Sequence, residues 1–190
     1  MKIHALTFSL AASILIIVAS SCDKNNDSNP TTLTLYDSLG GTAMVADPAN
    51  SGQMIEAGRL GIRSVVDSTI FVIAVDTAIN NYFAVLLSEI AMNDLSGFQE
   101  LSKNLTDFFC VATGAKDFQY TGLSMTEAHN PDAAPPTGNK DRIKQKVADD
   151  DFDQFINDLG TGATQNALPD YLISRVAEVA SSVRGAVVQR

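Results

Sequence analysis

The chain has 190 residues, of which 13 are Lys or Arg and 22 are Asp or Glu, so its formal net charge is −9. Such an acidic surface, without a basic stripe, repels nucleic acid, and we expect no nucleic-acid partner. The sequence contains no CxxC, HExxH, GxSxG or P-loop pattern. These absences remove the motif-based arguments for a zinc site, a serine hydrolase or a nucleotide-binding loop.

Residues 1–21 have the pattern of a bacterial lipoprotein signal peptide. Lys2 supplies a positive start, and the apolar stretch from Ala5 to Ala19 is short for a membrane span. Small residues lead directly to Cys22, which resembles a lipobox and implies cleavage before Cys22 and lipidation of that residue. An ordinary signal peptide cut nearby is the alternative. Removal of the leader leaves 12 basic and 22 acidic residues, a formal charge of 12 − 22 = −10.

Residues 22–32 are polar and have no apolar period, so we expect a flexible tether after the lipidated cysteine. Its acidic start resembles the export signals of surface lipoproteins in Bacteroidetes-like bacteria. We therefore expect a lipid-anchored protein of the bacterial cell envelope, at the outer membrane or cell surface. The body, residues 33–190, is long enough for one domain with a substantial core.

The first half of the body has helical periodicity. We expect a short helix in 34–41 closed by glycine, a loop over 45–52, a helix over 54–78 and a shorter apolar helix over 80–92. The clearest amphipathic helix ends at Gly114. Its predicted core face is marked by spacings of three and four between Leu95, Phe98, Leu101, Leu105, Phe108 and Ala112. Cys110, on the same helix, is expected to pack as a small hydrophobe rather than act as a catalytic thiol.

The second half begins with a capping box. Ser124 and Glu127 have the N-cap and N3 spacing, which predicts a short helix that carries Ala128 and His129. Prolines follow, and we expect a loop to Gly138. A helix is predicted over 150–159. The last pattern, residues 168–188, opens with Pro169 at an early helical position and should be the longest core helix.

His129 is the only histidine outside the leader. It has no companion ligands for a zinc site, which needs three or four, and no serine or cysteine partner for a triad. A single histidine can supply the whole protein ligation of a haem iron, because the porphyrin provides the other four nitrogens. Composition alone nevertheless favours a surface or core histidine.

A resemblance to a known family strengthens the hypothesis that His129 binds haem. The segments "LYDSLGG" (35–41), "VVDS…VDTAINNYF" (65–83), "FFCVATGAKDFQYTGLSMTEAH" (108–129) and the C-terminal pattern occur in the order of group I truncated haemoglobins. The resemblance implies an all-α, globin-like two-over-two helical sandwich, here with extended loops, and haem b as cofactor. His129 matches the proximal histidine, Phe83 the phenylalanine that wedges the haem, and Tyr120 and Met125 the proximal pocket lining.

The distal side departs from the family pattern. Ile70 stands where the family often has tyrosine, and Leu105 stands where it often has glutamine, with Leu101 one turn earlier; we assign Phe108 to the same pocket. Such a pocket offers bound oxygen no donor. A shift of one residue would instead place Thr69 or Asn104 there. Extra residues between Gly41 and Val65, and between His129 and Phe152, account for the extended loops.

Two functional hypotheses follow. The first is a lipid-anchored haem protein that binds a diatomic gas (O2, NO or CO) at a five-coordinate, His129-ligated iron, with NO/O2 redox chemistry and an unknown reductase as an extension. Under this hypothesis we expect the protein to bind haem and oxygen rather than to act as a dedicated enzyme. The second is a haem-free, globin-like lipoprotein that serves as an interaction or structural module. A visible spectrum with added haemin distinguishes them.

Overall fold

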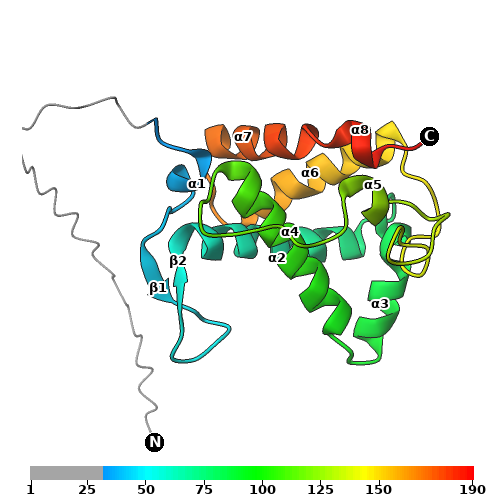
Figure 1. Cartoon of the computed structure of the whole chain (residues 1–190), viewed down its shortest axis with the longest axis horizontal. Coiled ribbons are helices and arrows are strands. Elements are labelled where there is room, and N and C mark those ends of the chain that lie inside the picture. The colour runs from blue at the N-terminus through cyan, green and yellow to red at the C-terminus, as the bar shows by residue number, and fades with distance from the viewer. Residues whose placement is uncertain (1–31) are drawn as a thin grey trace, which may run out of the picture. The chain divides into compact units, whose positions relative to one another are not determined.

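Two pairs of long helices, one pair laid over the other, form the main layers of the fold (Figure 1). The computed structural model describes residues 32–190. One pair is α2 (Ala57–Val75) and α4 (Ser96–Thr113), and the other is α6 (Asp149–Gln165) and α7 (Asp170–Ser181). The helices pack as α2 on α4, α6 on α7 and α2 on α6. The predicted signal peptide (1–21), Cys22 and most of the tether (22–32) lie outside the described residues.

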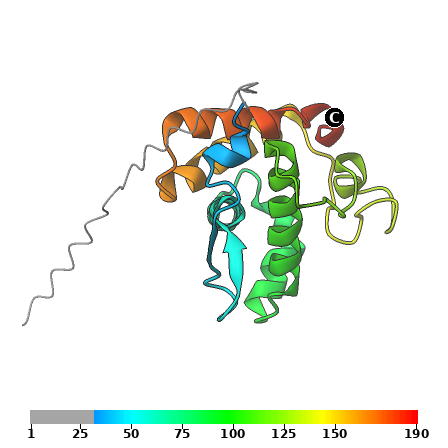
Figure 2. The same ribbon diagram turned by 60° about the vertical axis from the view of Figure 1, so that its left-hand side comes forward.

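The N-terminal elements include a β-hairpin whose two strands the sequence did not predict. Helix α1 (Leu35–Ser38) opens with a capping box, in which Asp37 N donates to Thr34 Oγ1 over 3.0 Å. Strands β1 (Met44–Ala46) and β2 (Met54–Glu56) then pair antiparallel. The loop predicted over 45–52 is confirmed from Asp47 on, while Val45 and Ala46 belong to β1. Asp47 closes the turn: its carboxylate accepts from Ala49 N (2.9 Å) and Asn50 Nδ2 (2.7 Å). Figure 2 shows the hairpin standing beside α4, below the α6–α7 layer.

Helix α2 is the centre of the core. Its predicted apolar line is confirmed, since one side is buried at Ile62, Val65, Val66, Thr69, Ile70 and Ile73. Each aliphatic side chain so buried contributes roughly 1.5–3 kcal/mol. The helix starts at Ala57 rather than Met54 because the preceding residues pair with β1. It approaches α6 closely: a Cβ added at Gly162 would lie 2.8 Å from Thr69 N.

Three predicted helices have different bounds. The segment 80–92 divides into a 3-10 turn η1 (Asn80–Phe83) and α3 (Ala84–Ala91). Helix α6 continues past the predicted end at 159. Gly162 lies inside this helix, where it packs closely against Thr69 of α2 instead of ending the helix. The C-terminal pattern divides into α7 and α8 (Arg184–Val187), with Pro169 as N-cap. At 12 residues α7 is shorter than α2, with 19, so the prediction of the longest helix was wrong.

A network near the C-terminal residues joins η1 to α6. Tyr82 Oη donates to Asp151 Oδ2 over 2.6 Å, and Arg190 Nη2 bonds the same oxygen at 3.0 Å. Val147 and Val188 form a parallel bridge beside it. Among the described residues, no single helix is both long and apolar enough to cross a membrane; α2 with η1–α3 meets that requirement only jointly, across a bend of 109°.

Candidate functional site

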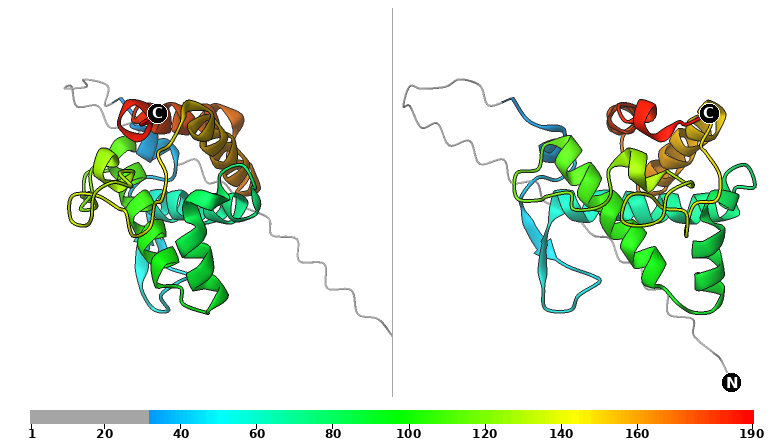
Figure 3. Two further views of the ribbon diagram at one scale, coloured as in Figure 1. Left: turned by 90° about the vertical axis from the view of Figure 1, so that its right-hand side faces the viewer. Right: turned by 45° about the vertical axis from the view of Figure 1, so that its right-hand side comes forward.

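His129 is positioned by α5 (Met125–Ala128), a single helical turn. The predicted capping box is present: Ser124 Oγ accepts from Glu127 N, and the Glu127 carboxylate accepts from Ser124 N over 3.1 Å. His129 is the C-cap of this turn, with φ −106° and ψ 9°, so the expectation that it lies within the helix was wrong by one residue. Figure 3 shows α5 and the following loop beside α4.

One hydrogen bond fixes the chemical form of the His129 imidazole. Its Nδ1 lies 2.7 Å from the carbonyl oxygen of Met125. A carbonyl can only accept, so Nδ1 must carry the proton, and the lone pair of Nε2 is left free. Burial lowers the pKa of His129, and the bond to Met125 opposes that shift only in part. The imidazole is therefore neutral at neutral pH, which is the form that coordinates a metal.

Helix α4 buries a face adjacent to the one predicted. Its buried residues include Ser102, Thr106, Phe109, Cys110 and Thr113, whereas Leu101, Leu105 and Phe108 are only half-buried. Leu95 is 51% exposed, so the predicted apolar core face was wrong in part. Small polar residues let α4 pack closely on α2, which turns the larger apolar side chains away from that contact. The result is a half-open apolar surface along α4.

The predicted pocket residues fall into two adjoining clusters. Ile70 is 3% exposed in the main cluster, against which Leu101, Leu105, Phe108 and Phe83 pack. Phe83 also packs against the second cluster, together with Met125. Tyr120 meets Phe108 edge-on at 6.3 Å and donates its hydroxyl hydrogen to Leu123 O over 2.5 Å. Burial raises the pKa of Tyr120.

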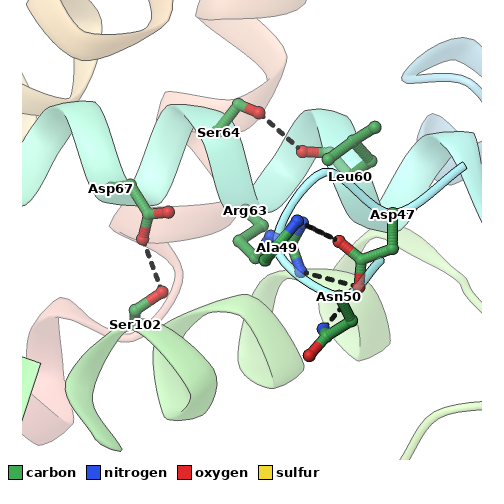
Figure 4. Close-up of polar contacts among 8 residues, drawn as sticks. All are labelled: Asp47, Ala49, Asn50, Leu60, Arg63, Ser64, Asp67 and Ser102. Carbon is green, nitrogen blue, oxygen red and sulfur yellow. Dashed lines mark hydrogen bonds and ion pairs between the residues drawn. The ribbon is translucent and has the colours of Figure 1, made fainter. Parts of the chain in front are cut away.

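Polar ties that the sequence reasoning missed join α2 to α4. Ser102 Oγ donates to Asp67 Oδ1 over 2.5 Å (Figure 4), and Arg59 pairs with Asp107 at 2.7 Å. Burial acts to raise the pKa of Asp107, but hydrogen bonds from Lys103 and Arg59 outweigh it and the net shift is downward. The i, i+4 spacing of Lys103 and Asp107 is the signal that could have revealed part of this network.

A second tie anchors the hairpin to the same helix. Arg63 on α2 pairs with Asp47 at 2.6 Å (Figure 4), and hydrogen bonds from Arg63 and Asn50 hold the pKa of Asp47 well below its usual range.

Cys110 has no features of a reactive thiol. It is 0% exposed, and burial raises its pKa to about 11. A thiol with such a pKa is almost wholly protonated at neutral pH and is a poor nucleophile. The expectation that Cys110 packs as a small hydrophobe is confirmed.

The segment 130–148 forms a strap from His129 to α3. Asn139 Nδ2 donates to Ala128 O over 3.0 Å, and Arg142 pairs with Glu89 on α3 at 2.9 Å. Ile143, in the same segment, packs against the second cluster, as do Met125 and Phe83. The sequence predicted a loop only to Gly138 and did not predict this strap.

A cavity of about 220 Å³ lies elsewhere. It is lined by residues of α2, α4, α6 and α7, including Ile62, Val65, Phe109 and Val176, and by none of the predicted site residues. Within residues 32–190, no group of three or more His, Cys, Asp or Glu side chains is placed to hold a metal ion. The chemically distinctive position among the described residues is thus His129, a neutral imidazole whose Nε2 lone pair is free.

The arrangement of the helices defines a globin-like, all-α fold with an added hairpin. No protein-family model matches the chain, and no curated protein does. Solved structures match it, among them a single-substitution mutant of truncated hemoglobin from Tetrahymena pyriformis in the Fe(III) form, with 18% sequence identity and a TM-score of 0.55. That match covers 83% of this chain and 100% of the other. The chain therefore has a truncated-haemoglobin fold.

Proposed function

We propose that the chain is a truncated haemoglobin of the group I type that binds haem b through His129 and a diatomic gas at the opposite face of the iron. The observation that carries this proposal is the Nδ1 bond to Met125 O, which leaves Nε2 of a neutral imidazole free. The globin-like fold and the half-open apolar surface of α4 support it. Haem iron, when bound, would supply the gas-binding chemistry.

Each predicted residue has a role in this proposal. His129 Nε2 would hold the iron, while Phe83, Tyr120 and Met125 would pack on the proximal side. Leu101, Leu105, Phe108 and Ile70 would line the distal side. The apolar area of Leu101, Leu105 and Phe108, which is only partly buried along α4, would drive retention of a flat apolar ring.

The distal pocket so assigned contains no side-chain donor. Thr69 does not replace one, because its hydroxyl donates to Val65 O over 2.8 Å and its position is closed by Gly162 of α6. Bound oxygen would therefore lack the hydrogen bond that a tyrosine or glutamine provides. We propose weak, fast oxygen binding, with CO and NO affected less because they are less polar when bound.

The location of the protein is also part of the proposal. The leader pattern before Cys22 supports a lipid anchor at the bacterial cell envelope. An acidic, tethered gas-binding domain would then stand away from the membrane surface. Reduction of the iron would be left to an unknown reductase.

The direct test is a haemin titration of the purified chain. Saturation at one haemin per chain with a Soret band distinct from free haemin is the expected result. A spectrum that remains the sum of protein and free haemin would favour the haem-free interaction module instead.

A further inference from the structure

Two buried carboxyl oxygens, one at the end of α2 and one on α6, have no hydrogen-bond partner. They are Asp76 Oδ2, at the C-cap of α2, and Asp158 Oδ2, on α6. Asp158 is 4% exposed, and the two side chains lie within hydrogen-bonding reach of each other. The remaining oxygens have donors: Asp76 Oδ1 accepts from Ala78 N (2.9 Å), and Asp158 Oδ1 accepts from Gln154 Nε2 (3.3 Å).

Two negative charges at this place would be costly. Each buried charge loses solvation, and the two repel in a medium of low polarity. The C-terminal end of α2 adds the negative end of its dipole. Asp76 is the charged group that acts on Asp158, and Gln154, its other side-chain neighbour, is neutral. None of the ion pairs among residues 32–190 includes either carboxyl group.

We propose that Asp76 and Asp158 share one proton, in a carboxyl–carboxylate hydrogen bond that braces α2 against α6 and is lost when the proton leaves. This accounts for both orphan oxygens at once, because the proton makes one of them a donor to the other. Burial, together with the charge of Asp76, raises the pKa of Asp158 to about 6. Asp158 thus gains and loses its proton close to physiological pH.

The sign of the effect on stability follows from linkage. The folded chain holds the Asp158 proton more tightly than the unfolded chain, in which an aspartate has its ordinary pKa of about 3.9. The brace is therefore complete below about pH 4 and is lost as pH rises through about 6. Asp76 leads directly into the turn that carries Tyr82 and Phe83, so loss of the proton would loosen the entry to that turn.

The test compares thermal unfolding of the haem-free chain at pH 5 and pH 7.5, so its outcome does not depend on the haem proposal. The variant is Asp158→Asn, whose amide can donate to Asp76 at any pH. The control is Asp150→Asn, an exposed carboxylate on the same helix. We expect the melting temperature of Asp158→Asn to exceed that of the unmodified chain by about 3–6 °C at pH 7.5 and by a clearly smaller margin at pH 5. The control should have the same melting temperature as the unmodified chain at both pH values.

A carbon-13 NMR titration of the Asp158 carboxyl in the unmodified chain gives an independent measurement. A midpoint near pH 6 supports the shared proton, and a midpoint at or below 4 overturns it. Calcium that stabilises the unmodified chain at pH 7.5 but not Asp158→Asn would also overturn it, since a cation rather than a proton would then occupy the pair. The NMR result remains decisive if the variant does not fold.

Discussion

At the residue scale, a backbone carbonyl fixes the tautomer of the His129 imidazole. The sequence predicted its capping box and its place in the chain, because Ser124 and Glu127 have a spacing with a local meaning. It did not predict the tautomer, which depends on one carbonyl, Met125 O, lying 2.7 Å from Nδ1. Such a contact arises only when the helix ends at Ala128 and the ring folds back.

Replacement of His129 by alanine removes the proposed iron ligand. We expect the Soret band of the haemin complex to disappear or haem affinity to fall at least about a hundredfold, since a metal-ligand bond is lost. Absorbance titration measures both. Gln119→Ala, an exposed neighbour on the preceding loop, is the control and should leave the spectrum unchanged. An unaltered spectrum in the His129 variant contradicts the assignment.

The distal pocket provides a second residue-scale prediction. Leu105 is half-buried, so Leu105→Gln can be accommodated, whereas Ile70 is 3% exposed and Ile70→Tyr would overpack the core. A new hydrogen bond to bound oxygen is worth roughly 1.5–3 kcal/mol, so Leu105→Gln should slow oxygen release about ten- to a hundredfold. Stopped-flow displacement by CO measures the rate.

Leu105→Met, which adds no donor, is the control for that experiment and should release oxygen as fast as the unmodified chain. Carbon monoxide release should change little in either variant. Slow oxygen release from the unmodified chain would show that a donor, such as Asn104, reaches the pocket.

At the scale of elements, α4 shows where sequence patterns mislead. Its apolar spacing indicated a core face, but the chain buries the polar strip of Ser102 and Thr106 and leaves Leu101 and Leu105 half-open. Periodicity shows that residues share a face, not what covers it. The hairpin strands were missed for a related reason: the hairpin is held on α2 by the pair of Asp47 with Arg63, residues too far apart in sequence for a local pattern to show.

The strap of residues 130–148 gives the prediction at this scale. Arg142→Gln removes the pair with Glu89 and should free the strap where it meets α3. Because the pair is partly exposed, it is worth at most about 1 kcal/mol, and we expect haem loss to speed up about two- to fivefold. Transfer of haem to an excess of a competing apoprotein measures the rate.

Lys144→Gln is the matched control, because Lys144 bonds only to backbone carbonyls within the strap. If both variants lose haem at the unmodified rate, the Arg142–Glu89 pair has no part in retention.

At the scale of the molecule, the order of helices was predictable and their assembly was not. The apolar line of α2 sufficed to place the core helix, yet its close approach to α6 depends on Gly162 meeting Thr69, a contact between residues far apart in sequence. Gly162 was expected to lie beyond a helix end. Contacts between residues far apart in sequence determine which helices pack together, and they become visible only in the folded structure.

The anchor is the prediction for the whole molecule. Cys22→Ser should release the protein to the soluble fraction or leave the leader uncleaved, because the acylated residue is removed. Membrane fractionation with labelled fatty acid measures both outcomes. Ser21→Ala keeps a small residue before the cysteine and should remain anchored. Labelling that persists in Cys22→Ser would contradict the lipid assignment.

The hairpin also offers a position for chemical labelling that would show on which side of the membrane the domain lies. Its tip, residues 48–53, is exposed, and its base is held by Asp47 and Arg63. A cysteine introduced at Ser51 would be reactive, whereas Cys110 is 0% exposed. A membrane-impermeant maleimide added to intact cells would therefore label Ser51→Cys on a surface-displayed chain and spare one that faces the interior.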